Sequence, residues 1–184
     1  MEQLQSETGK LAEVSITLRR FDLSDVDDLM VWTTDEKVGK FCGWDPTAFT
    51  SKDYATKAIA ERIIPHPYFR AICIDNRPIG EISVKTRTGC ECCRAEIGYV
   101  VASDYWGKGI ATKAVKMVVN EIFGEFPNLE RIEGTVDVEN EASQKVLEKC
   151  GFKREGILRK YLIHKGKTID MFMFSLLNTD PKVD

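Results

Sequence analysis

The chain has 184 residues, of which 43% are hydrophobic and 30% are charged, and its formal net charge is −3. Basic and acidic residues are interleaved along most of the length, which excludes a protein that binds nucleic acid through a strongly basic surface. No apolar stretch approaches the roughly 20 residues of a membrane-spanning helix, so no membrane partner is expected.

The first half of the chain predicts both strands and helices. Residues 14–20 alternate apolar and polar side chains, as a half-buried strand does. A helix opens at Ser24, with acidic residues in its first turn, and a second helix opens at Ser51. The segments 68–75 and 79–87, joined by an Asn-Arg-Pro turn, have the pattern of a β-hairpin.

The second half alternates strands with helices and finishes in two long strands. The expected elements are a strand over 94–101, a helix from Ile110, a strand over 131–138, a helix over 141–149, and strands over 152–163 and 168–177. Hairpins at either end and alternation in the middle predict a mixed sheet. We therefore expect one α/β domain over residues 13–178, with flexible tails at 1–12 and 179–184.

The six cysteines, at positions 42, 73, 90, 92, 93 and 150, are scattered through a chain of domain size. Such spacing differs from a small disulfide scaffold and predicts reduced thiols in the cytoplasm, with the nucleus as the alternative compartment. Cys90, Cys92 and Cys93 are close in sequence, but zinc usually takes four ligands, and the two histidines are His66 and His164. We expect exposed thiols on a turn there and no metal.

The segment YWGKGIATKA, residues 105–114, places glycines where a strand-like run gives way to a helix. A helix N-terminus exposes unpaired N–H groups, and Gly107 and Gly109 would let a phosphate approach the main chain without meeting a Cβ. Close packing against the rest of the protein is the alternative explanation for the two glycines.

Two common phosphate-binding loops do not fit this segment. A Walker-type loop needs Ser or Thr after Gly-Lys, whereas Gly109 and Ile110 follow Lys108 here. A dinucleotide fingerprint needs a third glycine near Thr112 and normally follows the first strand of the fold, whereas this segment begins after residue 100.

What remains resembles the GNAT family of acetyl-CoA-dependent N-acetyltransferases. The family's pyrophosphate loop, Arg/Gln-x-x-Gly-x-Gly/Ala, corresponds to residues 106–111, where Trp106 replaces the Arg or Gln. Tyr-Trp-Gly-x-Gly-x-Ala-Thr is similar to the branch of ribosomal-protein N-terminal acetyltransferases. The segment 140–152 resembles the family's Asn-x-x-Ser/Ala…Leu-x-Glu-Lys-x-Gly-Phe helix. The resemblance covers residues 14–177 and implies six or seven strands with helices on both faces.

The resemblance implies acetyl-CoA as acetyl donor and places its contacts. The main chain of Gly107, Lys108, Gly109, Ile110, Ala111 and Thr112 would hold the pyrophosphate, with Lys108 either adding charge or lying in solvent. By the same resemblance the preceding strand splays from its neighbour, and pantetheine enters the gap. N–H groups of Tyr99, Val100 and Val101 would hold the oxyanion, and Gly98 would suit the distortion or pack against an aromatic ring.

The resemblance also suggests catalytic residues. Glu96 lies in an otherwise apolar strand, where family members often carry the base; it would otherwise point to solvent. Ser143 resembles a serine that contacts the thiol, and Leu147 stands where other members have a proton-donating tyrosine. Asn140 would contact the cofactor, although Asn and Ser are also common helix caps.

The acceptor implied is a primary amine, with a protein N-terminus first and a small amine second. Phe41, Trp44 and Tyr68 lie in segments that shape the acceptor pocket in the family, or they are ordinary core and loop aromatics. Two further possibilities are a non-catalytic acyl-CoA-binding regulator on the same fold and a nucleotide-binding domain of another kind. The sequence leaves monomer and homodimer open.

Overall fold

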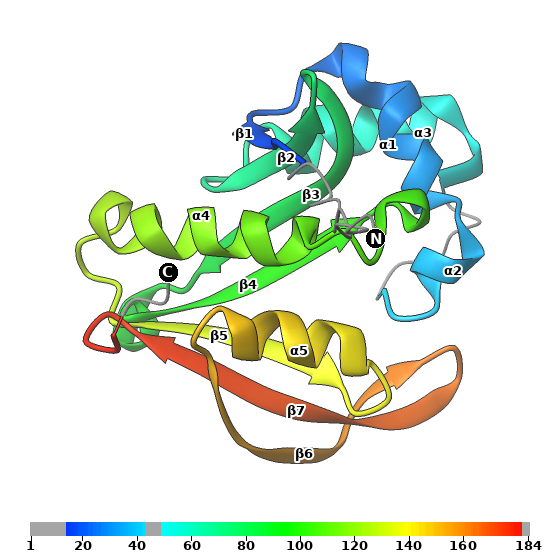
Figure 1. The fold of residues 1–184 in the computed structure, drawn as a ribbon. Coiled ribbons are helices and arrows are strands. Elements are labelled where there is room, and N and C mark those ends of the chain that lie inside the picture. Colours follow the sequence, from blue (N-terminus) through cyan, green and yellow to red (C-terminus); the bar gives the residue numbers. More distant parts are fainter. Residues whose placement is uncertain (1–13, 43–48, 182–184) are drawn as a thin grey trace, which may run out of the picture.

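A computed structural model describes residues 14–42 and 49–181 of the chain. Seven strands form one mixed sheet in the order β1-β2-β3-β4-β5-β7-β6 (Figure 1). Every neighbouring pair is antiparallel except β4 and β5, which are parallel. The strands are β1 Thr17–Arg19, β2 Phe69–Ile74, β3 Arg77–Thr86, β4 Arg94–Val101, β5 Arg131–Asp137, β6 Lys153–His164 and β7 Lys167–Leu177.

Side-chain caps begin most of the helices. Asp22 caps the 3-10 turn that leads into α1, Ser51 accepts from the N–H of Tyr54 at the start of α3, and Asn140 caps α5. The expected helices are confirmed, and the four-residue α2, too short for a periodic pattern, was not predicted. The helices are α1 Val26–Thr33, α2 Glu36–Gly39, α3 Lys52–Ala58, α4 Ile110–Glu125 and α5 Glu141–Lys149. None among the described residues is long and apolar enough to cross a membrane.

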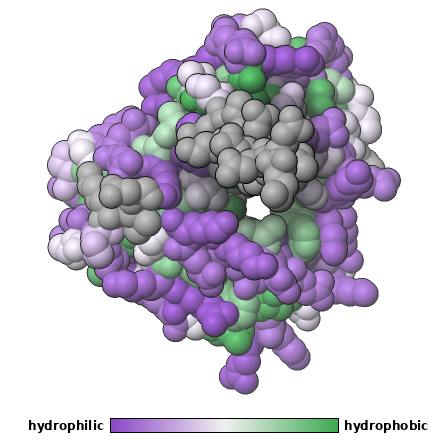
Figure 2. Space-filling model, in the orientation of Figure 1, coloured by the Kyte–Doolittle hydropathy of each residue, from purple (hydrophilic) through white to green (hydrophobic). Residues whose placement is uncertain are grey.

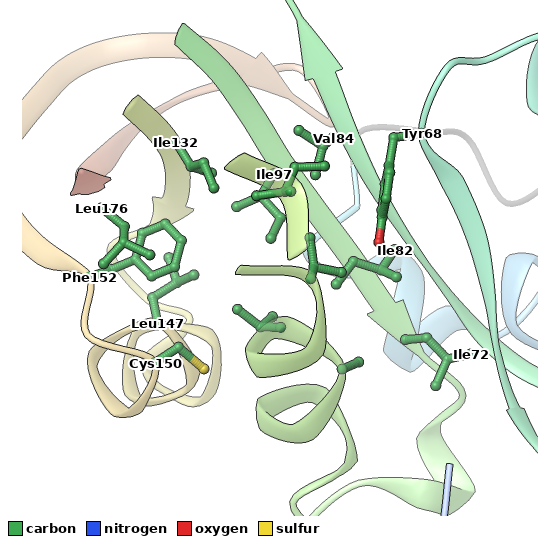
Figure 3. Close-up of a cluster of buried hydrophobic side chains, with 14 of the residues drawn as sticks. Tyr68, Ile72, Ile82, Val84, Ile97, Ile132, Leu147, Cys150, Phe152 and Leu176 are labelled. Atoms are coloured by element: carbon green, nitrogen blue, oxygen red, sulfur yellow. The ribbon is translucent and has the colours of Figure 1, made fainter. Parts of the chain in front are cut away.

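Helices cover both faces of the sheet, because each inner strand is apolar on both sides. In β2, Ile72 packs with α4 and α5 in one cluster, whereas its neighbours Ala71 and Cys73 pack with α1 and α3 in another. Figure 3 shows the first cluster, where Ile82 and Val84 of β3 face Ile97 of β4. Burying each such side chain stabilises the fold by about 1.5–3 kcal/mol.

The two hairpin turns adopt backbone conformations that their residues tolerate. Asp75 and Asn76 have φ of 48° and 65°, and Lys165 and Gly166 have φ of 48° and 78°. Two consecutive left-handed residues make a turn whose twist matches that of the flanking strands. The first turn therefore lies earlier than the predicted Asn-Arg-Pro, and Pro78 belongs to β3, opposite Cys73.

β4 and β5 pair at one end only. Their register pairs run from Arg94 opposite Arg131 to Glu96 opposite Glu133; beyond these, β4 continues to Val101 and β5 to Asp137 without pairing. Figure 1 shows the two strands diverging from this point. We call the paired segments, 94–96 and 131–133, the paired end, and the segments 97–101 and 134–137 the open end.

Gly80 keeps β4 against β3 while β4 leaves β5. A Cβ on Gly80 would lie 2.2 Å from the carbonyl oxygen of Val100, so only glycine allows this approach. At Gly98 a Cβ would meet just the Ser83 hydroxyl oxygen, at an ordinary 3.6 Å. The tight contact therefore lies on the neighbouring strand, and a part for Gly98, which lines the cavity, in the distortion stays a prediction.

Charged side chains cross the paired end in a continuous series. Arg94 and Arg131 each donate to Glu133 at 2.8 Å, and Arg131 also donates to Glu155 at 2.7 Å. Ser175 donates to the same Glu155 carboxylate at 2.7 Å, and these contacts lower the pKa of Glu155 to about 2. The series joins β4, β5, β6 and β7.

Candidate active site

A cavity of about 570 Å³ lies at the open end. Its walls are β4 from Ile97 to Val101, β5 from Gly134 to Asp137, the N-terminus of α4, one side of α5 and the loop after α2. Figure 2 shows an opening on the face that carries α4 and α5, with hydrophobic residues at its border. The residues predicted to bind the cofactor line this cavity, except Lys108: they are Tyr99, Val100, Val101, Gly107, Gly109, Ile110, Ala111, Thr112, Asn140 and Ser143.

The loop before α4 has the geometry of an anion site. Gly107 and Gly109 both have φ of 75°, and a Cβ on either would meet nothing within 4 Å. Close packing therefore does not explain these glycines, whereas their left-handed conformation does. The first backbone bond of α4 runs from the N–H of Lys113 to the carbonyl of Gly109, at 3.0 Å, and no side chain of the described residues caps the helix. The preceding N–H groups and the positive helix end thus face the cavity without an internal acceptor.

Trp106 and Lys108 of this loop have different roles. The Trp106 indole N–H donates to the carbonyl of Val101 at 2.7 Å, which ties the loop to the end of β4. Lys108 folds back outside the cavity, where its ammonium donates to the Asp104 carbonyl at 3.0 Å and lies over the Tyr105 ring. The main chain, rather than the Lys108 charge, therefore faces the space in front of α4.

Tyr99 and Ser143 meet across the cavity wall. The Tyr99 hydroxyl lies 2.8 Å from the Ser143 Oγ and donates to the Ser143 carbonyl at 3.2 Å. Burial raises the pKa of Tyr99, so its phenol stays protonated at neutral pH. The Asn140 side chain accepts from the Ser143 N–H at 3.1 Å and so caps α5 while lining the cavity. The hydroxyl of Tyr99, for which the sequence suggested only a main-chain role, is thus part of the site.

Leu147 packs where family members can carry a tyrosine. It is 1% exposed and lies beneath Gly134 of β5, where an added Cβ would come within 2.9 Å of Leu147 Cδ1. Leu147 therefore offers no hydroxyl to the cavity, and the hydroxyl of α5 that contacts Tyr99 is that of Ser143.

The structure does not bring Glu96 to the cavity. Glu96 stands in the last register pair of the paired end, opposite Glu133, and its carboxylate accepts from Arg87 at 3.2 Å. Its side chain is 40% exposed and is not part of the cavity wall. This position matches the solvent-facing alternative for Glu96, because the strands separate only beyond it.

A different glutamate, Glu81 of β3, lies beside the cavity wall. It stands opposite Val100, a wall residue, and is half-buried on the face that packs against α1. Burial raises the pKa of Glu81 to about 7, against the opposing effect of the Trp32 indole. This position could not be predicted from the sequence, because a polar residue between Gly80 and Ile82 is what a strand with one solvated face predicts.

The loop after α2 and strand β7 also contribute to the cavity wall. Phe41 lines the cavity as expected, together with Cys42 and Met171. The His164 imidazole Nε2 lies 2.8 Å from the carbonyl of Lys40, which brings the hairpin tip to this loop. Trp44 lies outside the described residues.

Tyr68 is a core residue rather than a wall of the acceptor pocket. It is fully buried in the cluster under α4, beside Ile82 (Figure 3). Its hydroxyl donates to Glu121 of α4 at 2.5 Å. This position matches the alternative that Tyr68 is an ordinary core aromatic, because its hydroxyl reaches Glu121 of α4 and the residue is not part of the cavity wall.

The cysteine-rich turn forms no ligand cluster. Cys90, Cys92 and Cys93 are exposed in and after a short 3-10 turn, and their thiols are free. Within residues 14–42 and 49–181, no group of three His, Cys, Asp or Glu side chains could hold a metal ion.

Comparisons with known proteins agree with this geometry. Residues 15–153 match the model of an acetyltransferase (GNAT) domain. An uncharacterised N-acetyltransferase of Bacillus licheniformis, p20, is 33% identical over 174 residues, which cover 90% of this chain and 94% of that protein. The solved ribosomal-protein-S5-alanine acetyltransferase of Vibrio fischeri superposes with a TM-score of 0.78 at 25% identity, covering 90% of this chain and 94% of that one.

A third protein shares the fold. The spermidine N-acetyltransferase of Vibrio cholerae, solved with CoA and spermine, has a TM-score of 0.76 at 21% identity and covers 90% of this chain and 96% of its own. This likeness is one of fold, and the anion site before α4 and the gap between β4 and β5 lie within that shared fold. The chain belongs to the GNAT family of acetyltransferases and is an N-acetyltransferase that uses acetyl-CoA.

Proposed function

We propose that this enzyme acetylates the amino terminus of a protein or peptide by direct attack of the amine on acetyl-CoA. The composition of the cavity wall carries the proposal. Among the described wall residues Asp137 is the one carboxylate, and its Oδ1 already accepts from the Glu139 N–H at 2.8 Å. A polyamine would need several carboxylates for its charges, whereas a peptide N-terminus brings one ammonium and an apolar or small side chain.

The donor is bound by main-chain groups. The loop from Gly107 to Thr112 would hold the pyrophosphate at the N-terminus of α4, and the pantetheine arm would lie between β4 and β5. Acetyl-CoA supplies the activated acyl group, and the open end of the sheet supplies a water-poor channel for it.

The unpaired edge of β4 can stabilise the oxyanion. The Ala102 N–H bonds to Ile79 of β3, and backbone groups of a strand point alternately to its two neighbours. The N–H groups of Tyr99 and Val101 therefore point into the gap, where they can donate to the oxyanion that forms when the amine attacks. The Ser143 and Tyr99 hydroxyls stand on the same wall, where they can donate to the leaving sulfur.

The likeness to the Vibrio fischeri enzyme and the Tyr-Trp-Gly-x-Gly-x-Ala-Thr segment support the peptide acceptor. The test is a mass-resolved acetylation screen with acetyl-CoA. One panel holds peptides with varied N-termini and blocked lysines, and the other holds polyamines and free amino acids. We expect acetylation of particular peptides, lost when the peptide N-terminus is blocked.

The other outcomes are informative as well. Turnover confined to the second panel would overturn the peptide acceptor and retain the acetyl transfer. Acetyl-CoA binding with no turnover on either panel would favour a regulator that binds acyl-CoA. Stabilisation by ATP or NAD, but not by CoA, in a melting assay would point to a different nucleotide ligand.

A further inference from the structure

Glu81 of β3 lies next to the cavity wall. Its register partners are Ala71 on β2 and Val100 on β4, so its side chain lies on the face that packs against α1. Side chains of directly opposed residues lie about 5 Å apart, and Val100 is part of the cavity wall. Cys42, a second wall residue, lies close enough for the Glu81 charge to raise its thiol pKa. Glu81 is therefore adjacent to two residues of the cavity wall, although it is not itself one of the residues that line it.

The Glu81 carboxylate has no cationic partner among the described residues. The Trp32 indole acts on the Glu81 carboxylate and lowers its pKa, and this indole N–H is buried with no hydrogen bond of ordinary geometry within the described part of the chain. By contrast, Glu96 is paired with Arg87, and Glu133 is paired with two arginines. A half-buried carboxylate without a counter-ion is costly to keep charged, so its retention beside the cavity calls for a function.

The groups that face Glu81 are mostly apolar, and a carboxylate in such surroundings can accept a proton near neutral pH. Trp32 comes from α1, Ala71 from β2, Val100 from β4 and Cys42 from the loop after α2. Of these four, only Cys42 has a titratable side chain. Its pKa is raised to about 12, mainly by burial and to a smaller extent by the charge of Glu81. The hairpin tip adds Lys165, whose charge opposes that shift at Cys42. Burial in this environment raises the pKa of Glu81 to about 7.

We propose that Glu81 is the general base of the reaction, accepting the proton of the acceptor ammonium directly or through one water molecule. This inference rests on the proposed acetylation of an amine. It assigns to β3 the role that the sequence suggested for Glu96 of β4.

The proposed reaction begins with a proton transfer to Glu81. The Glu81 carboxylate takes one proton from R–NH₃⁺, and the neutral amine nitrogen forms a bond to the thioester carbon. The carbonyl oxygen becomes the oxyanion near the N–H groups of Tyr99 and Val101. The C–S bond then breaks, the second nitrogen proton passes to the leaving thiolate, and the products are the amide and CoA thiol. Glu81 returns its proton to solvent.

The test compares Glu81→Gln with Glu96→Gln, which removes the same charge from the paired end. With a peptide that the wild type acetylates, we expect Glu81→Gln to lower kcat/KM about 100-fold at pH 7. The deficit should shrink above pH 9, because a peptide α-amine with a pKa of about 8 then loses its proton without help. Glu96→Gln should stay within about threefold of wild type at both pH values.

A structural role for Glu81 predicts a different result. If Glu81→Gln lowered activity by the same factor at every pH, or left the pH profile unchanged, the proposal would be overturned. Acetyl-CoA affinity and the melting temperature, measured for each variant, show whether the donor site and the fold remain intact. Should Glu81→Gln not fold, Glu81→Asp keeps the charge on a shorter side chain, and a pH profile with partial activity and an unshifted acidic limb would contradict the proposal.

The failure of this inference differs from the failure of the proposed function. If the wild type acetylates no amine of either panel, the proposed function is wrong, and the role of Glu81 as a base in that reaction is wrong with it. If the wild type acetylates an amine while Glu81→Gln matches it at pH 7, the function stands and the assignment of Glu81 is wrong.

Discussion

The paired end and the open end of β4 and β5 differ in whether their polar groups have partners. At the paired end, each carboxylate and each guanidinium of the series from Arg94 to Glu155 has a partner. Beyond Glu96 the inner edge of β4 has no strand partner, and beside this gap the N–H groups at the start of α4 have no acceptor and the Glu81 carboxylate has no cationic partner among the described residues. Satisfied polar groups maintain the fold, whereas unsatisfied ones are available to ligands.

The largest effect is expected at Gly80, which stands opposite Val101 at the open end. Replacing Gly80 with Ala puts a Cβ at 2.2 Å from the Val100 carbonyl oxygen, a backbone atom that cannot turn aside. We expect unfolding in urea to show a loss of about 3 kcal/mol. Gly98→Ala is the matched control, because its Cβ meets an ordinary 3.6 Å contact. Equal losses for the two variants would contradict the assigned role of Gly80.

Substitutions at the paired end should lower the free energy of unfolding and leave kcat unchanged. Glu133 is 9% exposed and accepts from Arg94 and Arg131, so Glu133→Ala should cost about 2 kcal/mol while kcat stays unchanged. Glu141, exposed and paired with Lys145, provides a control that should lose less than about 0.5 kcal/mol. A large fall in kcat for Glu133→Ala would show that the two ends are not independent.

The anion site should respond in affinity. Gly109→Ala forces a left-handed alanine at the mouth of α4, and we expect acetyl-CoA binding, measured by calorimetry, to weaken about tenfold. Gly89 has φ of 65° and is equally open, but it lies in the turn before β4. Gly89→Ala should therefore cost similar stability without a change in Kd, and a matching loss of affinity would argue against the site.

The smallest effect concerns pH. The pKa of Glu155 lies at about 2, below its ordinary value, because Arg131 and Ser175 donate to the carboxylate. Its contribution to stability is therefore present above pH 4.5 and is lost as the pH falls toward 2. The midpoint of urea unfolding should fall over this range, and less steeply in Glu155→Gln. Parallel curves for the two proteins would contradict this assignment.

At Glu81 the effect of pH on the stability of the fold has the opposite sign from that at Glu155. Its folded pKa, about 7, is above the ordinary value, so its ionisation destabilises the fold as the pH rises from 4.5 through 7. Glu81→Gln should therefore be more stable than wild type at pH 8 and should lose this advantage at pH 4.5. Such a gain in stability with a loss of activity is the usual consequence of a strained functional group.

Most of the fold could be predicted because its patterns are local. Helical spacing from Ile110, the caps at Ser51 and Asn140, and the hairpin periodicities all depend on neighbours in sequence, and the structure confirms these elements. The four-residue α2 was missed because a single turn has no period, and the first hairpin turn moved because Asn76 tolerates a positive φ.

The site was only partly predictable, because its other half depends on where strands separate. The glycine loop and the Asn140–Ser143 turn are contiguous motifs and line the cavity. Glu96 and Glu81 look alike in sequence, each a lone acid in an apolar strand. Only the register shows that β4 still pairs with β5 at Glu96, and that α1 covers the face of β3 that carries Glu81.

The one-ended pairing of β4 and β5 has a mechanical consequence. Strands β1–β4 and strands β5–β7 form two blocks, joined within the sheet by the register pairs of residues 94–96 with 131–133. A donor molecule lying between Tyr99 and Val136 would contact both blocks. It would link them at the open end, where no backbone hydrogen bonds join β4 to β5. Binding of CoA should therefore slow hydrogen exchange in β4 and β5 together, as the two blocks become a single rigid unit.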